Sequence, residues 1–250
     1  MVRGLVISGL SLVSMVGCGQ MAPAASAPVD AKQVVAMQTK LSDWPQLGRY
    51  AGENAALAPP AKGEKRVVFY GDSITDAWGR RDGTGDFFPG RPYVNRGISG
   101  QTTAQMVVRF EQDVVHLKPA AVVILAGTND IAGNTGPMTT EMTQDNFEAM
   151  VAIAKQNGIK VVITSITPAA AFPWRTSVTG VADSVRADNA MLKALCAREG
   201  LVYVDYYSAL ANAQGGFDAD LSFDGVHPRE KAYAVMAPLA QAGIDKALGQ

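Results

Sequence analysis

Three residue types that cooperate in acyl chemistry stand in two short polar segments of this 250-residue chain. The segment GDSIT, residues 71–75, places Ser73 directly after an apolar run, and the segment DGVHP, residues 224–228, places Asp224 three residues before His227. A serine that attacks an acyl carbonyl needs a base with a pKa near neutrality, and histidine is the natural choice. The imidazole needs a carboxylate that holds it in one tautomer. We therefore expect Ser73, His227 and Asp224 to act as nucleophile, base and orienting acid.

The attacked carbonyl develops negative charge on its oxygen, so such a site also needs hydrogen-bond donors aimed at that oxygen. Gly100 lets its backbone N–H approach a ligand closely because no side chain blocks it. Asn129, in the segment GTND of residues 127–130, offers a side-chain amide. The backbone N–H of Ser73, at the start of a helix, is a third donor. We expect Ser73, Gly100 and Asn129 to form an oxyanion hole.

These segments need a scaffold that brings them together, and the apolar pattern of the chain predicts one. Short runs rich in valine and isoleucine predict strands at residues 66–70, 93–96, 120–125, 160–164 and 201–205. Helical patterns cover residues 103–117, 139–157, 181–199 and 228–247. This alternation is typical of parallel strands with helices on both faces of the sheet. Chemistry in such sheets collects at the carboxyl ends of the strands, where we expect the polar segments to meet.

In this order, GDSIT, the loop around Gly100, GTND and DGVHP resemble the four sequence blocks of the SGNH/GDSL hydrolase family. The resemblance runs from Arg66 to the C-terminus, and Ile74 stands where the family name has leucine. It implies a flavodoxin-like three-layer α/β/α sandwich with a mainly parallel five-stranded sheet, and an enzyme without cofactor or metal. It also implies the roles given above for Ser73, His227, Asp224, Gly100 and Asn129.

Each of these residues also has an ordinary structural interpretation. Serine is a common helix cap and aspartate a common turn residue, so Ser73 or Asp224 alone would indicate no chemistry. Gly100 suits a loop turn, and the pair at residues 129–130 suits a turn or a cap. Their joint occurrence at predicted strand ends and helix starts favours a catalytic site over four unrelated turns.

Two aromatic residues, Phe172 and Trp174, are candidates for substrate binding. They stand in a loop that we expect on the active face, and ligand pockets favour aromatic lining. Ordinary anchoring of the loop is the alternative interpretation. The other histidine of the chain, His116, suits the C-terminal end of a helix and is given no catalytic role.

Charge and composition argue against several other classes of function. Lys and Arg total 22 against 23 Asp and Glu, so the chain has no basic excess with which to bind nucleic acid. Two cysteines and two histidines are too few for a Cys/His metal cluster, and no spacing of carboxylates indicates a metal site. Cys196 falls in an amphipathic helical stretch and is expected to be a buried free thiol.

The first residues have the pattern of an export signal. Arg3 precedes an apolar run over residues 4–16. The run ends in Ser-Met-Val-Gly-Cys, which resembles a bacterial lipobox and makes Cys18 a candidate for lipid attachment. We expect a signal peptide of the lipoprotein type over residues 1–18, with ordinary cleavage between residues 22 and 27 as the alternative.

The rest of the chain is expected to consist of a tether and one domain. Residues 19–37 include an Ala/Pro-rich stretch without an apolar period, which predicts a flexible tether. Residues 38–250 are long enough for one sizeable core and are expected to form the hydrolase domain. The protein would then be exported, either periplasmic or anchored in the outer membrane as a lipoprotein.

The sequence thus predicts a serine esterase that cleaves short-acyl carboxylic esters, acetyl or similar, on a small molecule or a glycan. The predicted connections are short and no long apolar lid stands among them, which favours an open site. The alternatives are acyl transfer to a sugar hydroxyl, lysophospholipase or thioesterase activity, and a non-catalytic binding role in the cell envelope. The oligomeric state is not predicted.

Overall fold

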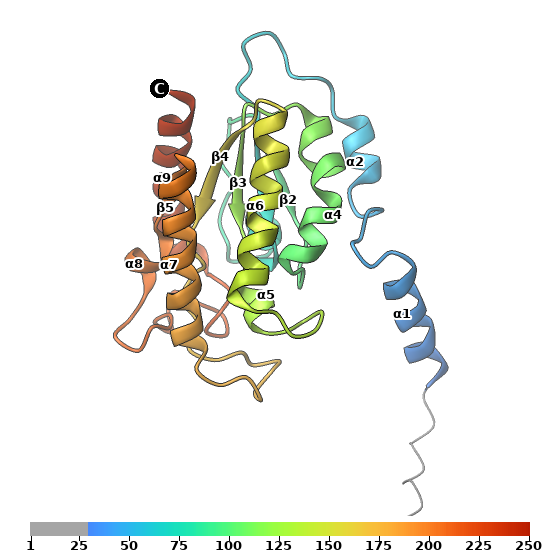
Figure 1. Ribbon diagram of the computed structural model, residues 1–250, viewed down its shortest axis with the longest axis vertical. Helices are drawn as coiled ribbons and strands as arrows, with labels where there is room; N and C mark the ends of the chain where they lie inside the picture. Colours follow the sequence, from blue (N-terminus) through green and yellow to red (C-terminus); the bar gives the residue numbers. More distant parts are fainter. Residues whose placement is uncertain (1–29) are drawn as a thin grey trace, which may run out of the picture. The chain divides into compact units, whose positions relative to one another are not determined.

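The computed structural model describes residues 30–250 (Figure 1). The chain divides into two units at the boundary between residues 38 and 39. The larger unit, residues 39–250, contains the sheet and all candidate residues for catalysis and substrate binding. The predicted export signal with Cys18 lies outside the described residues, as does the first part of the predicted tether.

The described end of the predicted tether is helical. Helix α1 (Ala31–Ser42) begins there, so residues 31–37 are not irregular chain, and they are exposed. Alanine, lysine, glutamine and methionine, which make up much of this stretch, are strong helix formers. Asp30 accepts a hydrogen bond from the backbone N–H of Lys32 (3.2 Å), which satisfies one of the donors left open at a helix start.

Five parallel strands form one sheet in the order β2-β1-β3-β4-β5. The strands are β1 (Val67–Gly71), β2 (Tyr93–Gly97), β3 (Ala121–Leu125), β4 (Lys160–Thr164) and β5 (Val202–Val204). The predicted α/β sandwich with a five-stranded parallel sheet is confirmed. Because Gly71 is in register with both Gly97 and Leu125, the segments that follow β1, β2 and β3 leave the sheet side by side.

Helices cover both faces of the sheet. They are α2 (Ala51–Ala56), α3 (Ser73–Ala77), α4 (Thr103–Asp113), α5 (Thr128–Ile131), α6 (Thr140–Gln156), α7 (Val181–Glu199), α8 (Tyr206–Leu210) and α9 (Glu230–Leu248), with a 3-10 turn, η1 (Val115–Leu117), after α4. Helices α4, α6 and α7 lie side by side over one face (Figure 1), and α9 contacts β3, β4 and β5 from the other. None of the helices over residues 30–250 is long and apolar enough to cross a membrane.

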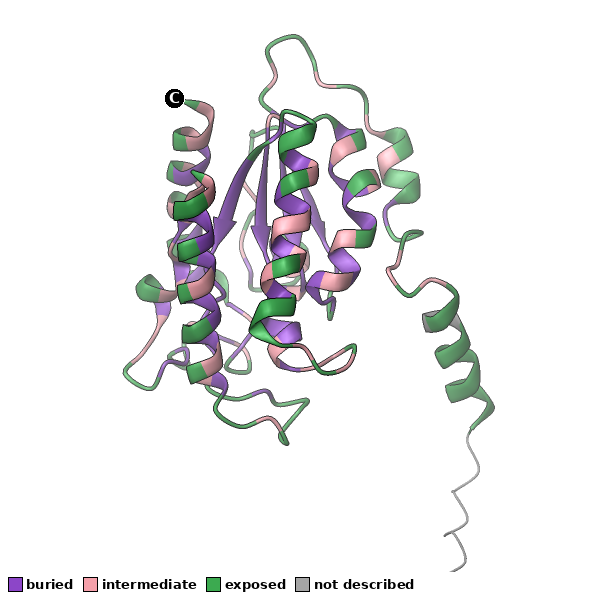
Figure 2. Ribbon diagram, viewed as in Figure 1, coloured by how far each residue is buried: buried purple, intermediate pink, exposed green. Residues whose placement is uncertain are grey.

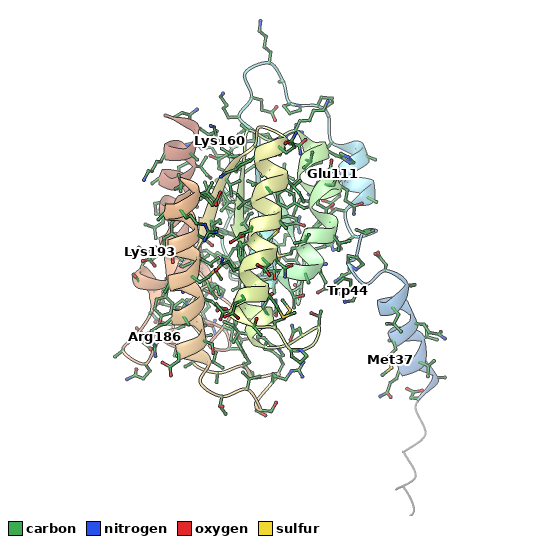
Figure 3. All side chains as sticks on the ribbon, in the orientation of Figure 1. Met37, Trp44, Glu111, Lys160, Arg186 and Lys193 are labelled. Atoms are coloured by element: carbon green, nitrogen blue, oxygen red, sulfur yellow. The ribbon has the colours of Figure 1, made fainter. Side chains whose placement is uncertain are left out.

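Two apolar cores lie between these layers. Successive residues of β1 alternate between them, so Val68 and Tyr70 pack under the α4, α6 and α7 layer while Val67 and Phe69 pack against α9. The strands and the inner faces of the helices are buried (Figure 2). Charged residues such as Glu111, Lys160 and Arg186 point outward (Figure 3). The apolar runs within β1, β3 and β4 fit a parallel sheet that is covered on both sides.

A buried arginine fastens the carboxyl ends of β1 and β2 to α4. The guanidinium of Arg109 is 0% exposed and donates to the carbonyl oxygens of Gly71 (3.0 Å) and Arg96 (2.9 Å). It also donates to the Gln101 side chain and pairs with Asp113 (3.1 Å). A buried charge is costly unless it is paired and hydrogen-bonded, and these contacts supply both conditions.

Two buried aspartates fix the starts of helices at the same edge. Asp72 caps α3 by accepting the N–H of Ile74 (2.9 Å), and Asp130 accepts the N–H of Thr103, the first residue of α4 (3.1 Å). Burial raises the pKa of Asp72 to about 7 and the pKa of Asp130 to about 6, although these hydrogen bonds oppose the rise. Both side chains therefore brace the loops that carry the candidate site, at a cost in desolvation.

The close approach of α3 to β2 depends on Gly97, and we expect Gly97→Ala to destabilise the fold. A Cβ at this position would lie 2.1 Å from the backbone N of Asp76 and 2.6 Å from its Cα, and backbone atoms cannot move aside as a side chain can. We expect a loss of about 3 kcal/mol in the free energy of unfolding, measured by urea denaturation.

The matched control is Gly52→Ala in α2, where a Cβ would meet nothing within 4 Å. This substitution should be neutral or stabilise the protein by about 0.5–1 kcal/mol, because alanine is the better helix former. Equal unfolding midpoints for Gly97→Ala and the parent protein would show that the α3–β2 contact is looser than described.

Candidate active site

Ser73 stands at the turn between β1 and α3. It is the first residue of α3, directly after the cap Asp72, so its backbone N–H is one of the donors at the helix start that has no partner within the helix. The turn is tight: a Cβ at Gly71 would lie 2.2 Å from Oγ1 of Thr75 and 2.6 Å from the carbonyl oxygen of Leu125. The glycine before the cap thus allows Ser73 to stand directly at the carboxyl edge of the sheet.

His227 is held by a compact loop rather than by a helix cap. The predicted helix start at residue 228 is wrong, since α9 begins at Glu230 with Arg229 as its cap residue. The physical reason is that Pro228 pairs with Ser222 in an isolated antiparallel bridge. The Ser222 hydroxyl donates to the carbonyl oxygen of His227 (2.8 Å), which fixes the backbone on the histidine side of the loop.

The side chains of Ser73, His227 and Asp224 lie in one hydrogen-bonded row. Oγ of Ser73 is 3.0 Å from Nε2 of His227, and Nδ1 of His227 is 2.7 Å from Oδ2 of Asp224. The other carboxylate oxygen of Asp224 accepts the backbone N–H groups of His227 (2.9 Å) and Val226 (3.1 Å). This geometry allows a proton to pass from the hydroxyl to the imidazole while the carboxylate faces the opposite ring nitrogen.

The environment of Asp224 keeps its carboxyl group ionised at neutral pH. Partial burial raises its pKa, but the hydrogen bonds from the backbone and the imidazole of His227, and from the N–H of Val226, outweigh this effect. The pKa of Asp224 therefore lies below its usual range. A charged carboxylate next to Nδ1 favours the tautomer that presents Nε2 to Ser73 as an acceptor.

The predicted oxyanion donors belong to residues that line one cavity together with Ser73. The backbone N–H groups of Ser73 and Gly100 have no acceptor among the residues that the structure describes. Gly100 has φ +81°, a left-handed conformation that favours glycine, and a Cβ there would meet nothing within 4 Å. The Asn129 amide donates to the carbonyl oxygen of Gln101 (3.0 Å) and lies 3.4 Å from Oδ2 of Asp72. Unused backbone donors beside a hydroxyl suit a developing negative charge.

Asn134 is a site residue that sequence reasoning missed. Its amide donates to Oδ1 of Asn129 (2.8 Å) and to the carbonyl oxygen of Gly100 (3.1 Å), and its own Oδ1 accepts the indole N–H of Trp174 (3.3 Å). By occupying the Oδ1 of Asn129, it leaves the NH₂ end of that amide to face Gln101 and Asp72. The only signal in the sequence is a polar residue five positions after Asn129, which many loops share.

Ser73, His227 and the predicted oxyanion residues line a cavity of about 530 Å³. Its lining combines the candidate catalytic residues with arginines that the sequence did not single out: Arg49, Ser73, Asp76, Ala77, Arg80, Arg81, Ser99, Gly100, Asn129, Asn134, Trp174 and His227. Of the two predicted aromatic residues, only Trp174 lines it; this side chain is 42% exposed, and its ring centroid is 5.9 Å from that of His227. Phe172 is 1% exposed in the core and does not line this cavity, and its ring centroid is 5.2 Å from that of Trp174.

The other candidate nucleophiles and bases lack such partners. Ser99 lies in the cavity, but its hydroxyl donates to Oδ2 of Asp76 (2.7 Å) and faces no imidazole. His116 is exposed beside Glu111, remote from the cavity lining. Cys196 is a buried free thiol, and burial raises its pKa to about 12. Over residues 30–250, no three His, Cys, Asp or Glu side chains are grouped in a way that could hold a metal ion.

Comparison with curated proteins finds relatives that match parts of this chain. An acetylxylan esterase of Geobacillus stearothermophilus is 38% identical over 90 residues, which are 28% of this chain and 41% of that protein. The uncharacterised lipoprotein YqeF of Bacillus subtilis (strain 168) is 32% identical over 78 residues, which are 30% of this chain and 32% of that protein. The chain thus spans less than half the length of these two curated relatives.

A family profile and a solved structure match far more of the chain. The profile of the GDSL-like lipase/acylhydrolase family matches residues 69–235, more than half of the chain and all four polar segments. The crystal structure of a GDSL-like lipase from Bacteroides thetaiotaomicron VPI-5482 is 43% identical, with a TM-score of 0.78. The match covers 82% of this chain and 99% of that one. On sequence and on fold together, the chain belongs to the GDSL-like lipase/acylhydrolase family.

Proposed function

We propose that this protein is a serine esterase with Ser73 as nucleophile, His227 as base and Asp224 as the acid that orients the imidazole. The observation that carries the proposal is the unbroken row from Oγ of Ser73 to Nε2 of His227 (3.0 Å) and from Nδ1 to Oδ2 of Asp224 (2.7 Å). Membership of an acylhydrolase family, over a match that includes all three residues, supports it.

In the first half of the reaction, Oγ of Ser73 attacks the ester carbonyl while His227 takes the hydroxyl proton. The negative charge that develops on the carbonyl oxygen is stabilised by the backbone N–H groups of Ser73 and Gly100 and by the Asn129 amide. His227, now cationic beside the charged Asp224, gives its proton to the leaving alcohol. An acyl group remains bonded to Ser73.

In the second half, water replaces the alcohol. His227 takes a proton from the water as it attacks the acyl-enzyme carbonyl, and the same donors stabilise the second oxyanion. Collapse of this intermediate returns the proton to Oγ of Ser73 and releases the carboxylic acid. The open cavity of about 530 Å³ admits water and supports hydrolysis of small esters. The similarity to an acetylxylan esterase favours short acyl groups, with a glycan as one carrier.

We also propose that the protein is exported and carries a lipid on Cys18. The apolar run over residues 4–16 with its lipobox-like end supports this, as does the similarity to a lipoprotein of Bacillus subtilis. We expect labelled palmitate to be incorporated in cells that express the full chain, and to be absent from Cys18→Ser. The control is Cys196→Ser, which changes the other cysteine and should keep the label. A mature N-terminus beyond residue 18 would exclude the anchor.

The proposed row predicts that Ser73 and His227 act as a unit. We expect Ser73→Ala and His227→Ala each to lower kcat for p-nitrophenyl acetate by about 10⁶, and the double variant to lose hardly more. Ser99→Ala is the matched control, because this serine lines the same cavity without facing the imidazole, and it should keep most of the activity. Losses that multiply in the double variant would contradict the proposal.

The proposed oxyanion hole predicts an effect on kcat rather than on KM. We expect Asn129→Ala to lower kcat by roughly 10²–10³, because the lost hydrogen bond is made to the transition state. Asn157→Ala removes an exposed asparagine at the end of α6 and should leave both constants near those of the parent protein. A rise in KM at constant kcat would remove Asn129 from the oxyanion hole.

A further inference from the structure

The residues that line the cavity beside Ser73 include more positively charged side chains than negatively charged ones. Three arginines, Arg49, Arg80 and Arg81, line it, and Asp76 is the one carboxylate among its lining residues. An excess of one sign of charge in a cleft raises the local concentration of ligands of the opposite charge. Whether the excess is available to a ligand depends on which of the arginines already has partners.

Arg80 is held by three hydrogen bonds within the protein. It donates to Oδ1 of Asp76 (3.0 Å), to the hydroxyl of Tyr50 (2.7 Å) and to the carbonyl oxygen of Asn95 (3.0 Å). The second carboxylate oxygen of Asp76 accepts the N–H and the hydroxyl of Ser99 (3.2 and 2.7 Å). Arg80 and Asp76 therefore balance each other, and both have structural partners.

Arg49 has only long contacts to acids. Its nearest carboxylates, on Asp76 and Glu53, are both 3.9 Å away. Asp76 is held by Arg80, and Glu53 lies closer to Arg96, at 3.2 Å. Contacts of 3.9 Å are too long for hydrogen bonds, so the donors of Arg49 remain open to a ligand in the cavity.

Arg81 has neither an ion pair nor a side-chain hydrogen bond within the part of the chain that the structure describes. Its guanidinium is nevertheless held in place, because it lies 4.0 Å over the ring of Phe223, above which Arg229 also lies (4.5 Å). The N–H of Phe223 donates to the carbonyl oxygen of His227 (2.9 Å). The same loop therefore orients both the imidazole and this arginine.

We infer that Arg81, together with Arg49, binds an anionic group of the substrate. The inference rests on the proposed esterase function and names its substrate class: an ester whose acyl or alcohol part bears a carboxylate or a phosphate. A guanidinium fork matches both groups with two parallel hydrogen bonds. A side chain that is already stacked on an aromatic ring loses little conformational freedom on binding, which favours Arg81 as the main contact.

The test compares three acetate esters of similar shape: 4-acetoxybenzoate, 4-acetoxyphenyl phosphate and the neutral 4-acetoxybenzamide. The first two separate a carboxylate from a phosphate, and the rate in buffer alone corrects each for its own reactivity. The variants are Arg81→Gln, Arg49→Gln and their combination. Arg81→Lys keeps the charge without the fork, and Arg91→Gln, an exposed arginine outside the cavity lining, is the matched control.

We expect the parent protein to prefer at least one anionic ester over the amide by about 10-fold in kcat/KM. One hydrogen bond to a charged group stabilises a complex by about this factor. Arg81→Gln should abolish the preference through KM at nearly constant kcat, since this contact is remote from the reacting carbonyl. Arg81→Lys should restore part of it, and Arg91→Gln should keep all of it. Salt should reduce the preference in the parent protein.

Equal rates on all three esters, or a preference that survives in the combined arginine variant, would overturn the inference. Calorimetric binding of 4-acetoxybenzoate and 4-acetoxyphenyl phosphate to Ser73→Ala protein separates this result from a failure of the proposed esterase function. Binding that depends on Arg81, without turnover of any ester by the parent protein, would contradict the esterase and support the anion site. If neither anion binds, the anion site is overturned, whatever the rates of ester hydrolysis are.

Discussion

The buried guanidinium of Arg109 is the interaction on which the arrangement of the candidate site depends. Gly71 and Arg96 are buried at the carboxyl edge of the sheet, and buried carbonyl oxygens need hydrogen-bond donors. Arg109 supplies those donors to Gly71, two residues before Ser73, and to Arg96 at the end of β2. Its desolvated charge is balanced by Asp113 on the same helix. The exit of β1 is thus fixed by a side chain of α4 as well as by Asp72 in the turn that follows the strand.

Gln101 connects Arg109 to the candidate oxyanion donors near Ser73. Its side chain accepts from Arg109 and donates to the carbonyl oxygen of Pro45, and its backbone carbonyl accepts from the Asn129 amide. The residue directly before it is Gly100, whose N–H has no acceptor among the described residues. One glutamine therefore connects the strand ends, the Gly100 loop and the asparagine. A network in which every buried polar group has a partner holds its members in a single arrangement, and aimed donors need this.

Local sequence patterns predict the strands and helices of the scaffold but not the contacts between its loops. The strands are predictable because runs of valine and isoleucine reflect burial on both faces, and the exits that hold Ser73, Gly100 and Asn129 follow from the strands. Arg109 gives no such signal, since a charged residue next to Phe110 looks like the solvent face of a helix. The role of Asn134 depends on how its loop folds back on Asn129, and the burial of Phe172 depends on tertiary packing. The spacing between Asp224 and His227 is local, so their pairing could be expected, whereas the bridge that displaces the start of α9 could not.

The candidate catalytic groups lie in one stretch of the chain, whereas the two arginines of the proposed anion site come from inside and outside that stretch. The row from Ser73 to His227 and the amide donors lie within residues 69–235, the part that the family profile matches. Arg49, in contrast, comes from a segment that precedes this match, and Arg81 follows α3 in the turn after the serine. Side chains at the rim of a cavity can change without disturbing the hydrogen bonds beneath them, because Arg109, Gln101 and Asn129 hold those bonds from below. The charge at the rim can therefore select the ester while the buried network keeps the reacting groups in place, which is how one fold supports many substrates.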